Sequence, residues 1–390
     1  MRLLILTDRF PPHDRGGAER IAYYHAQAMR EEGWEVGVLT GMPPRSSARE
    51  VGDSGTAVFR GYTFPQTRVG VTAQAAVGAL YNPIAAGAVR RAIRDFRPDV
   101  IHAHLTARIS LAAAAQSSAQ YPTVITFHGY HFECPKGGLY RKRGEICVAK
   151  PVQCKMYAAW NLRGLSRIRR IIAISRFIEE RLLTTGFDRG RVLYLPNGVP
   201  GIEERAACPL PGSHRILYAG VLEAHKGVAS LIRAFLRISG ENVSLTIAGH
   251  GRERAKLESL AGGDRRILFV GWHSHEDLRA LYQESQIVAV PSLWHEVMNT
   301  VICEAQSWSR PVVASAVGGN RDLIEDGVSG LLYPPGDESA LASALSRLLD
   351  NHAEAQLLAS NGFRSVKQLS MNRHKQALLS LYRTILDERH

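Results

Sequence analysis

The chain is predicted to be an α/β protein built from two doubly wound domains. Two observations predict this class. Short runs of β-branched and aliphatic residues alternate with segments of helical spacing along most of the 390 residues, a pattern typical of βαβ units with buried parallel strands. A polar segment rich in Pro and Gly, residues 203–212, interrupts that alternation and marks a domain boundary.

The first domain is expected to span residues 1–200. It opens with the strand 2–6, and the helix expected next, 18–32, has its apolar residues at helical spacing. Residues 41–80 show the least periodicity and are expected to be rich in loops. The further strands of this domain are expected at 35–39, 99–103, 123–127, 171–174 and 192–195.

The second domain is expected to span residues 201–370 and to repeat the alternation. Residues 371–390 are expected to form a terminal helix that packs back on the first domain. Because parallel sheets bind ligands beyond the carboxyl ends of their strands, we expect a site in a cleft across which the domains face each other. The strands are expected at 215–219, 243–248, 266–270, 286–290, 311–315 and 330–333, with helices near 226–238, 252–261, 275–284, 297–309 and 338–350.

Charge is distributed unevenly along the chain. Lys and Arg number 48 and Asp and Glu 36, a formal net charge of +12. Residues 1–200 hold 28 basic and 15 acidic residues, whereas the remainder holds 20 and 21. A basic N-terminal half suits an acidic membrane face or a phosphorylated acceptor. It is also compatible with an ordinary solvated surface. Nucleic-acid binding is not expected, because no recognised motif accompanies the basic residues.

Composition excludes several other classes of protein. Hydrophobic residues make up 45% and charged residues 22%, so the chain is neither disordered nor fibrous. The stretch nearest to an apolar run of about 18 residues, 72–89, is mostly Ala and Gly and contains Asn82-Pro83, which argues against a transmembrane helix. Five cysteines imply no disulfide framework. We expect a cytoplasmic protein, with peripheral contact at the inner face of the membrane as an added possibility.

The sharpest local motif is HEVMNTVICEA, residues 295–305. Glu296 and Glu304 are eight residues apart, with a mostly apolar run between them. With a helix expected from Val297, Glu296 lies at a strand-to-helix turn and Glu304 two turns inside the helix. The N–H groups of such a helix start bind phosphate or sugar oxygens. The alternative is that both carboxylates are structural.

Two further strand ends carry glycines. In AGVLEAHKG (219–227), Gly220 follows a strand and Lys226 could place an ammonium against a phosphate. In IAGHGRER (247–254), Gly249 allows a ligand to approach the backbone. Arg254 stands where a dinucleotide fingerprint needs its third glycine, which disfavours a nicotinamide enzyme.

The first domain offers an anion nest and a group of histidines. Gly16 and Gly17 precede the first helix and could bind an anion. In FHGYH, His128 could act as a general acid or base or as a hydrogen-bond donor, or be a satisfied core histidine, and His131 follows it. His102 and His104 share one strand face and are interpreted as mostly structural.

No metal site is expected. Zinc sites usually contain tight pairs such as CxxC, and the cysteines near the two histidines of FHGYH are too widely spaced for one. An ordered loop with free thiols is the favoured interpretation. The cysteines concerned are Cys134, Cys147 and Cys154.

Taken together, the ordered motifs resemble the retaining glycosyltransferases of family 4, which have the GT-B fold. The resemblance covers roughly residues 1–350, and its most specific part is the Glu-x7-Glu motif with the glycines downstream. The motifs that carry it are GGAER, DVIHAH, FHGYH, IIAIS, LPNGV, AGVLEAHKG, IAGHG, VPSLWHE…E and PVVAS…GG…IEDGVSGLL.

The resemblance implies that the first domain, residues 1–200, binds the acceptor and that the second domain, residues 201–370, binds the nucleotide sugar. It also implies roles for individual residues. Glu304 would bind the ribose hydroxyls, Glu296 the hydroxyls of the donor sugar, and Lys226 the diphosphate. Gly16 and Gly17 would close over the diphosphate, and His128 would lie beside the reacting centre. The remaining donor-binding positions would be Gly220, Gly249, Val297, Met298, Asn299 and Thr300.

The resemblance also implies a metal-independent reaction with retention. No cofactor is expected beyond a nucleotide-sugar co-substrate, a UDP-sugar by preference or a GDP-sugar. The acceptor is expected to be a lipid-linked or cell-envelope glycan, with a soluble natural product or metabolite as the alternative.

The sequence departs from the family pattern at one position, since many members carry an arginine where this chain has Val221. A non-catalytic sugar-nucleotide-binding protein is therefore a further alternative.

Overall fold

The computed structural model describes residues 1–11, 17–41, 50–51, 57–60, 83–105, 111, 115, 120–140, 146–147, 150–166 and 168–388. Contacts divide the chain into two compact units. Unit 1 comprises Met1–Leu139, Val148–Gly198 and Asn372–His390, and unit 2 comprises Tyr140–Cys147 and Val199–Met371. The sequence did not predict that the short segment Tyr140–Cys147 groups with the second unit.

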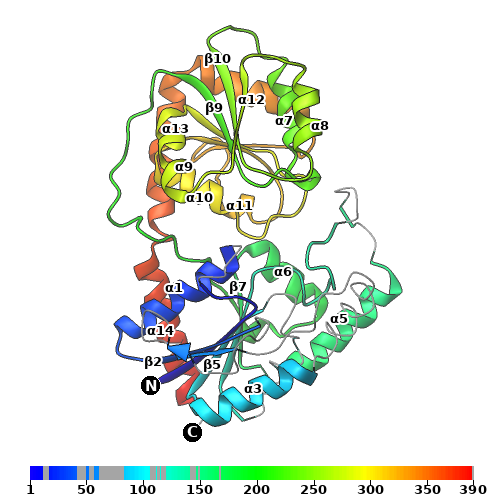
Figure 1. Ribbon diagram of the computed structural model, residues 1–390, viewed down its shortest axis with the longest axis vertical. Coiled ribbons are helices and arrows are strands. Elements are labelled where there is room, and N and C mark those ends of the chain that lie inside the picture. Colours follow the sequence, from blue (N-terminus) through cyan, green and yellow to red (C-terminus); the bar gives the residue numbers. More distant parts are fainter. Residues whose placement is uncertain are drawn as a thin grey trace. The chain divides into compact units, whose positions relative to one another are not determined.

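Unit 1 is built on an eight-stranded sheet in the order β3-β4-β2-β1-β5-β6-β7-β8. All of its described strand pairs are parallel except β3 with β4. The central strands are buried along their length because helices flank them (Figure 1). The strands are β1 (Arg2–Thr7), β2 (Glu35–Thr40), β3 (Glu50–Val51), β4 (Ala57–Arg60), β5 (Val100–Leu105), β6 (Thr123–Phe127), β7 (Arg170–Ala173) and β8 (Val192–Tyr194).

The helices of unit 1 begin and end at recognisable residues. In α6, the Ser175 hydroxyl accepts a hydrogen bond from the Ile178 N–H, and Gly186 ends the helix in the left-handed conformation. The last helix, α14, carries Leu378, Tyr382 and Ile385 on its buried face. The helices of this unit are α1 (Gly17–Glu31), α3 (Pro83–Phe96), α5 (Val152–Leu165), α6 (Arg176–Thr185), η1 (Arg189–Arg191) and α14 (Met371–Asp387).

Unit 2 contains a wholly parallel six-stranded sheet in the order β11-β10-β9-β12-β13-β14. With the sheet of unit 1, it confirms the predicted fold class. Its strands lie within one or two residues of the predicted ones. They are β9 (His214–Ala219), β10 (Val243–Ala248), β11 (Ile267–Gly271), β12 (Ile287–Val290), β13 (Val312–Ser315) and β14 (Leu331–Tyr333).

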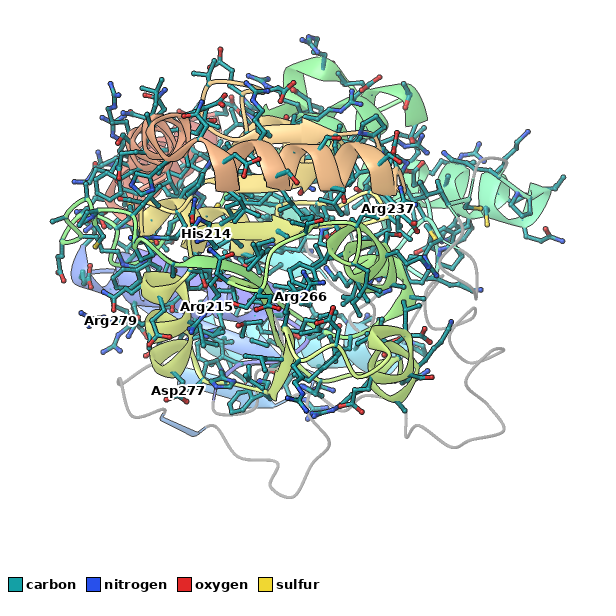
Figure 2. All side chains as sticks on the ribbon, turned by 90° about the horizontal axis from the view of Figure 1, so that it is seen from above. His214, Arg215, Arg237, Arg266, Asp277 and Arg279 are labelled. Carbon is teal, nitrogen blue, oxygen red and sulfur yellow. The ribbon has the colours of Figure 1, made fainter. Side chains whose placement is uncertain are left out.

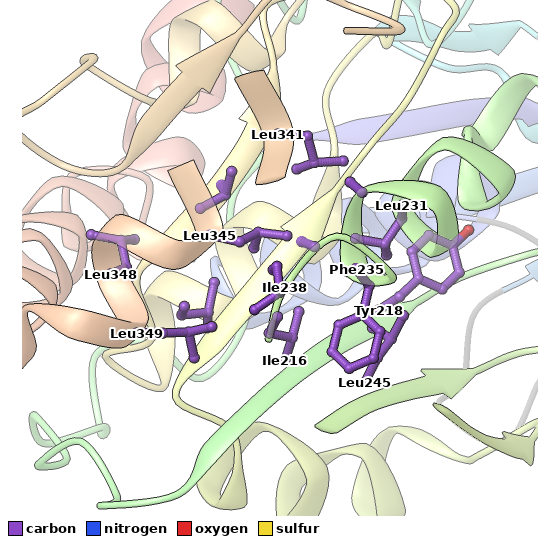
Figure 3. Close-up of a cluster of buried hydrophobic side chains, with 14 of the residues drawn as sticks. Ile216, Tyr218, Leu231, Phe235, Ile238, Leu245, Leu341, Leu345, Leu348 and Leu349 are labelled. Atoms are coloured by element: carbon purple, nitrogen blue, oxygen red, sulfur yellow. The ribbon is translucent and has the colours of Figure 1, made fainter. Parts of the chain in front are cut away.

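One face of this sheet packs against α7 and α12. Figure 3 shows Ile216 and Leu245 from the strands among Leu231 and Phe235 of α7 and Leu345 of α12. Burial of these large apolar side chains stabilises the scaffold that carries the loops. The helices of unit 2 are η2 (Ala224–Lys226), α7 (Val228–Phe235), α8 (Arg254–Ala261), α9 (His275–Glu284), α10 (Thr300–Ser307), α11 (Asn320–Leu323), α12 (Glu338–Asp350) and α13 (His352–Lys367).

Structural ion pairs occupy the amino ends of the unit 2 strands. Arg215 pairs with Glu284, and Arg266 pairs with Asp264 at 2.7 Å. Figure 2 labels both arginines. The loops at the opposite, carboxyl ends are therefore the place to look for a ligand site.

Among the helices of the described part of the chain, none has the length and apolarity needed to cross a membrane.

Candidate functional site

Three loops at the carboxyl ends of β9, β10 and β12 pack together, backbone against backbone. The Leu222 N–H donates to the His250 carbonyl at 2.8 Å. A Cβ on Gly249, whose φ is +155°, would overlap the Gly220 carbonyl, and a Cβ on Gly251 would overlap that of Leu222. The predicted glycines thus allow these loops to approach closely, which is why larger residues are excluded there.

The loop after β9 is tied to the loop after β12 in the same way. Gly227 has a φ of +73°, and a Cβ there would overlap the Pro291 carbonyl. The Leu293 N–H donates to the His225 carbonyl at 2.9 Å. These contacts hold Lys226, which ends the short helix η2, beside the chain that follows β12.

Glu296 and Lys226 form a partly buried ion pair between these two loops. Lys226 Nζ lies 2.8 Å from Glu296 Oε1, and the Ser292 hydroxyl donates to the same oxygen at 2.5 Å. Glu296 is 4% exposed, so Lys226 and Ser292 offset the cost of removing its carboxylate from water. The family resemblance implies that Lys226 binds a diphosphate and Glu296 a sugar, and it did not indicate that the two form an ion pair.

Gly318 and Gly319, the downstream glycines of the motif, contact the backbone of Glu296. The Gly319 N–H donates to the Glu296 carbonyl at 2.7 Å. Gly318 has a φ of +47°, and a Cβ there would overlap the same carbonyl. These glycines therefore fix the backbone of Glu296, which explains their place in the motif. Ser292, by contrast, was missed, because a single serine in a loop gives no sequence signal.

The helix after Glu296 begins later than predicted. Helix α10 starts at Thr300, and the Asn299 side chain caps it by accepting from the Val301 N–H at 3.1 Å. Val297 is buried and Met298 is half-buried in the non-helical segment before the cap. The prediction of a helix from Val297 was therefore wrong, because Asn299 satisfies the first free N–H groups and sets the start.

Glu304 lies one turn inside α10, not two. Its Oε2 accepts a hydrogen bond from the Tyr282 hydroxyl at 2.9 Å. Burial, with the nearby Glu304 charge, raises the pKa of Tyr282, so the phenol stays a hydrogen-bond donor. Burial raises the pKa of the adjacent Cys303 thiol to about 12, which keeps it neutral and unreactive. Tyr282 is a partner that the sequence did not reveal.

Val221 lies at the surface of the β9 loop. It is 44% exposed, and its carbonyl accepts a hydrogen bond from the Tyr218 hydroxyl at 2.9 Å. An apolar side chain thus stands exposed directly after Gly220, where the resemblance leads one to expect an arginine.

An aromatic cluster adjoins Lys226 within unit 2. Tyr140 stacks on His225 with ring centroids 4.9 Å apart and meets Trp294 edge-on at 5.7 Å. The Lys226 ammonium lies 5.2 Å from the centre of the Trp294 ring. These rings bound the ion pair on one side, and the sequence did not single them out.

In unit 1, His128 lies at the end of a hydrogen-bonded series of imidazoles. The nitrogen pairs are His128 Nε2 with His104 Nδ1 at 2.9 Å, His104 Nε2 with His25 Nδ1 at 3.2 Å, and His25 Nε2 with His374 Nε2 at 2.7 Å. His374 Nδ1 lies 2.8 Å from the Pro196 carbonyl oxygen. Burial lowers the pKa of His128 to about 3 and that of His374 to about 4.

His102 lies beside this series, with Nδ1 2.5 Å from the Tyr382 hydroxyl and Nε2 2.7 Å from the Thr126 hydroxyl. His102 and His104 are fully buried. Burial, followed by repulsion from neighbouring imidazoles, lowers the pKa values of His25, His102 and His104. Their role in the core agrees with the interpretation from sequence, but their connection to His128 was not predicted.

The other predicted positions of unit 1 are less informative. Gly16 lies outside the described residues, and Gly17 begins α1. His131 packs in the turn around Gly129 and Gly137, where burial lowers its pKa. The cysteines are all free thiols.

Two families match the chain in succession. Residues 15–200 match the family described as "Glycosyltransferase Family 4", and residues 213–351 match the one described as "Glycosyl transferases group 1". The matches together leave out residues 1–14 and 201–212 and, at the other end, residues 352–390 with helices α13 and α14.

Curated relatives extend over most of the chain. Glycogen synthase of Mycobacterium tuberculosis is 28% identical over 377 residues, which cover 91% of this chain and 88% of the relative. Phosphatidyl-myo-inositol mannosyltransferase of Mycobacterium leprae is 28% identical over 379 residues, which cover 95% of this chain and 93% of the relative.

Solved structures agree on the fold. Sucrose-phosphate synthase from Thermosynechococcus elongatus superimposes with a TM-score of 0.79 at 22% identity, over 99% of both chains. HepE of Anabaena, solved with UDP-glucose, gives a TM-score of 0.74 at 19% identity, over 98% of this chain and 100% of that one. At such identities the likeness shows the GT-B fold alone. With both family matches and the Glu-x7-Glu site, it leads to one conclusion: the chain belongs to the family 4, group 1 glycosyltransferases, which transfer a sugar from a nucleotide sugar.

Proposed function

We propose that this protein transfers a sugar from a UDP-sugar, or from a GDP-sugar, to an acceptor hydroxyl with retention and without a metal. The observation that carries the proposal is the Lys226–Glu296 pair, built at 2.8 Å from two loops at the carboxyl edge of the unit 2 sheet. Glu304 follows Glu296 by eight residues and lies one turn inside α10. One edge of the sheet thus offers the Lys226 ammonium to a diphosphate and the carboxylates of Glu296 and Glu304 to hydroxyl groups.

The chemistry follows from where charge develops. Departure of the nucleotide places negative charge on its diphosphate, which the Lys226 ammonium and the N-terminus of α10 would stabilise. Glu296 would hold hydroxyls of the donor sugar, so that the anomeric carbon is presented correctly. Glu304 would bind the ribose hydroxyls, and His128 would contact the reacting sugar, as the family resemblance implies.

UDP is preferred to GDP in this proposal because of the relatives. HepE, which shares the fold of this chain, was solved with UDP-glucose. This supports a uridine nucleotide as the donor. Glu304 binds any ribose in the same way, so it does not discriminate between the bases.

For the acceptor, we propose a lipid-linked or cell-envelope glycan at an anionic membrane surface. Helix α3 exposes Arg90, Arg91 and Arg94, and Arg97 follows its end. Such a row of arginines is attracted to anionic lipids. The name of the Mycobacterium leprae relative, which acts on phosphatidyl-myo-inositol, points the same way. A soluble natural product or metabolite is the second candidate, because exposed arginines also occur on ordinary solvated surfaces.

A non-catalytic nucleotide-sugar-binding protein is a further candidate, since Val221 is exposed where an arginine is expected. It predicts nucleotide binding without turnover.

The test of the proposed transfer is to incubate the protein with UDP- and GDP-sugars and extracted lipids, with and without EDTA, and to determine the anomeric configuration of the product by NMR. A retained configuration in EDTA supports the proposal. An inverted product, or dependence on a metal, would contradict it.

The membrane component needs its own experiment. Sedimentation with anionic vesicles should capture the wild type at low salt and lose it at high salt. Exchange of Arg90, Arg91 and Arg94 for Gln should abolish capture, while the exposed Arg364→Gln on α13 serves as the control. Equal capture of both variants would favour a soluble acceptor.

A further inference from the structure

Five histidines gather inside unit 1 from segments far apart in the sequence. His25 lies on α1, His102 and His104 on β5, and His374 on α14, and all four are buried. His128, directly after β6, is the member that reaches solvent. The series of hydrogen bonds described above links it through His104 and His25 to His374 and the Pro196 carbonyl.

The carbonyl at the end of this series fixes the position of every proton. A carbonyl oxygen can only accept, so His374 carries its hydrogen on Nδ1 and its Nε2 must accept. His25 then donates from Nε2 and accepts at Nδ1, and His104 does the same. His128 must therefore donate from Nε2, which leaves its Nδ1 with a lone pair.

We propose that His25, His104 and His374 are positioning residues that hold His128 in its Nε2–H tautomer, so that Nδ1 accepts a hydrogen bond from a substrate hydroxyl. The proposal rests on the proposed function, since it assumes that His128 touches the sugar. It bears on the roles that the sequence left open, because toward the substrate His128 is then a hydrogen-bond acceptor, while its Nε2–H donates to His104. The tautomer of a histidine is set by what its second nitrogen contacts.

The cluster is held neutral by its surroundings. Burial lowers the pKa of each of the five imidazoles, and repulsion between them lowers those of four further. Neutral rings carry one hydrogen each, which is the condition that the series requires. His102 completes the packing without joining the series, since its nitrogens contact Tyr382 and Thr126.

A metal ion is the competing explanation. His25, His102 and His104 each offer a nitrogen, and these lie within 4.8 Å of one another. A metal there would take lone pairs that the series uses, and His102 would give up one of its two hydroxyl partners. Because each of these nitrogens already has a hydrogen-bond partner, the geometry favours the series of neutral rings.

The tautomer can be read directly by NMR. In protein labelled with ¹⁵N-histidine, long-range ¹H–¹⁵N correlations distinguish Nε2–H from Nδ1–H, and the spectrum of His128→Gln identifies the signals of His128. We expect a single Nε2–H tautomer in the wild type at neutral pH. An Nδ1–H tautomer, or an imidazolium, would overturn the proposal. This readout requires neither donor nor acceptor, so it remains valid even if the proposed function fails.

Two variants of His374 then test the series. In His374→Gln, the amide can still donate to the carbonyl and accept from His25, so the tautomer should persist and kcat/KM should stay within about threefold. In His374→Leu, the fixed end is lost, so His128 should become a tautomer mixture and kcat/KM should fall about tenfold. His352→Gln, on the exposed start of α13, is the control.

The other outcomes of these experiments also support or contradict the proposal. If His374→Leu keeps the wild-type tautomer, the series does not set it and the proposal is wrong. If His374→Leu fails to fold, the wild-type spectrum and His374→Gln still decide. Elemental analysis completes the test, because one transition metal per chain, removed by a chelator with a change in the histidine signals, would establish the metal site instead.

Discussion

Acidification should destabilise unit 1 through the same histidines. His374 is buried against the Pro196 carbonyl and His25, and its pKa is lowered from the ordinary 6.5 to about 4. In the unfolded chain the ring binds a proton near pH 6.5, whereas the folded protein does not. The stability that its neutral form contributes is therefore complete above pH 6.5 and is lost as the pH falls from there toward 4.

The magnitude follows from the two pKa values. Between about pH 8 and about pH 5, His374 alone should lower the free energy of unfolding by about 2 kcal/mol. The pKa values of His25, His102, His104 and His128 are lowered in the same direction, so the total fall should be steeper than one histidine allows. A fall of this size is a large share of the stability of a typical domain, about 5–15 kcal/mol.

The assay is urea unfolding followed by circular dichroism over this pH range, with the free energy extrapolated to water. His374→Gln cannot titrate, so its fall between the same pH values should be smaller than that of the wild type by about 2 kcal/mol. His352→Gln should behave as the wild type does. Identical pH dependence of the wild type and His374→Gln, or stability that rises on acidification, would refute the reasoning.

Three further changes are predicted. Gly227→Ala places a Cβ against a backbone carbonyl at a φ of +73° and should lower the free energy of unfolding by roughly 2–4 kcal/mol; thermal unfolding should show a much smaller loss for Gly262→Ala, where the added Cβ meets open space. Arg181→Met removes the bidentate partner of Glu133, which is 1% exposed, but leaves its ion pair with Lys150, so it should cost roughly 1.5–3 kcal/mol in urea unfolding. Adding Glu133→Gln should recover part of that loss, and no recovery would count against a charge effect. Val221→Arg should tighten UDP binding about tenfold in calorimetry through a charge-assisted contact, and an unchanged affinity would place the diphosphate elsewhere.

Most of the fold could be predicted because buried parallel strands leave a strong local signal. The strand at 123–127 was predicted to the residue, and the helix at 275–284 likewise. The start of α10 was misplaced because one capping side chain, Asn299, outweighs the apolar spacing before it. Helices α5 and α6 were not assigned. In α5 the apolar Met156 and Trp160 are exposed while the polar Asn161 is buried, so its sequence shows no clear apolar face.

Contacts in the candidate site could be expected from the sequence where the residues are neighbours in the chain, and were missed where they are far apart. The spacing of Glu296 and Glu304 was visible as a motif. The Lys226–Glu296 pair joins residues 70 positions apart, and the contact between His25 and His374 spans 349. Such contacts depend on the order of strands in the sheet, which a single sequence does not display.

The central claim is that the carboxyl edge of the unit 2 sheet binds a nucleotide sugar. Calorimetric titration of the purified protein with UDP and GDP, in EDTA, tests it most directly. One nucleotide should bind to the wild type, and Glu304→Ala should weaken binding at least tenfold through loss of the ribose hydrogen bonds, while Glu241→Ala, an exposed control in the same unit, should bind as the wild type does. Binding that survives Glu304→Ala unchanged, or no binding of either nucleotide, would contradict the account.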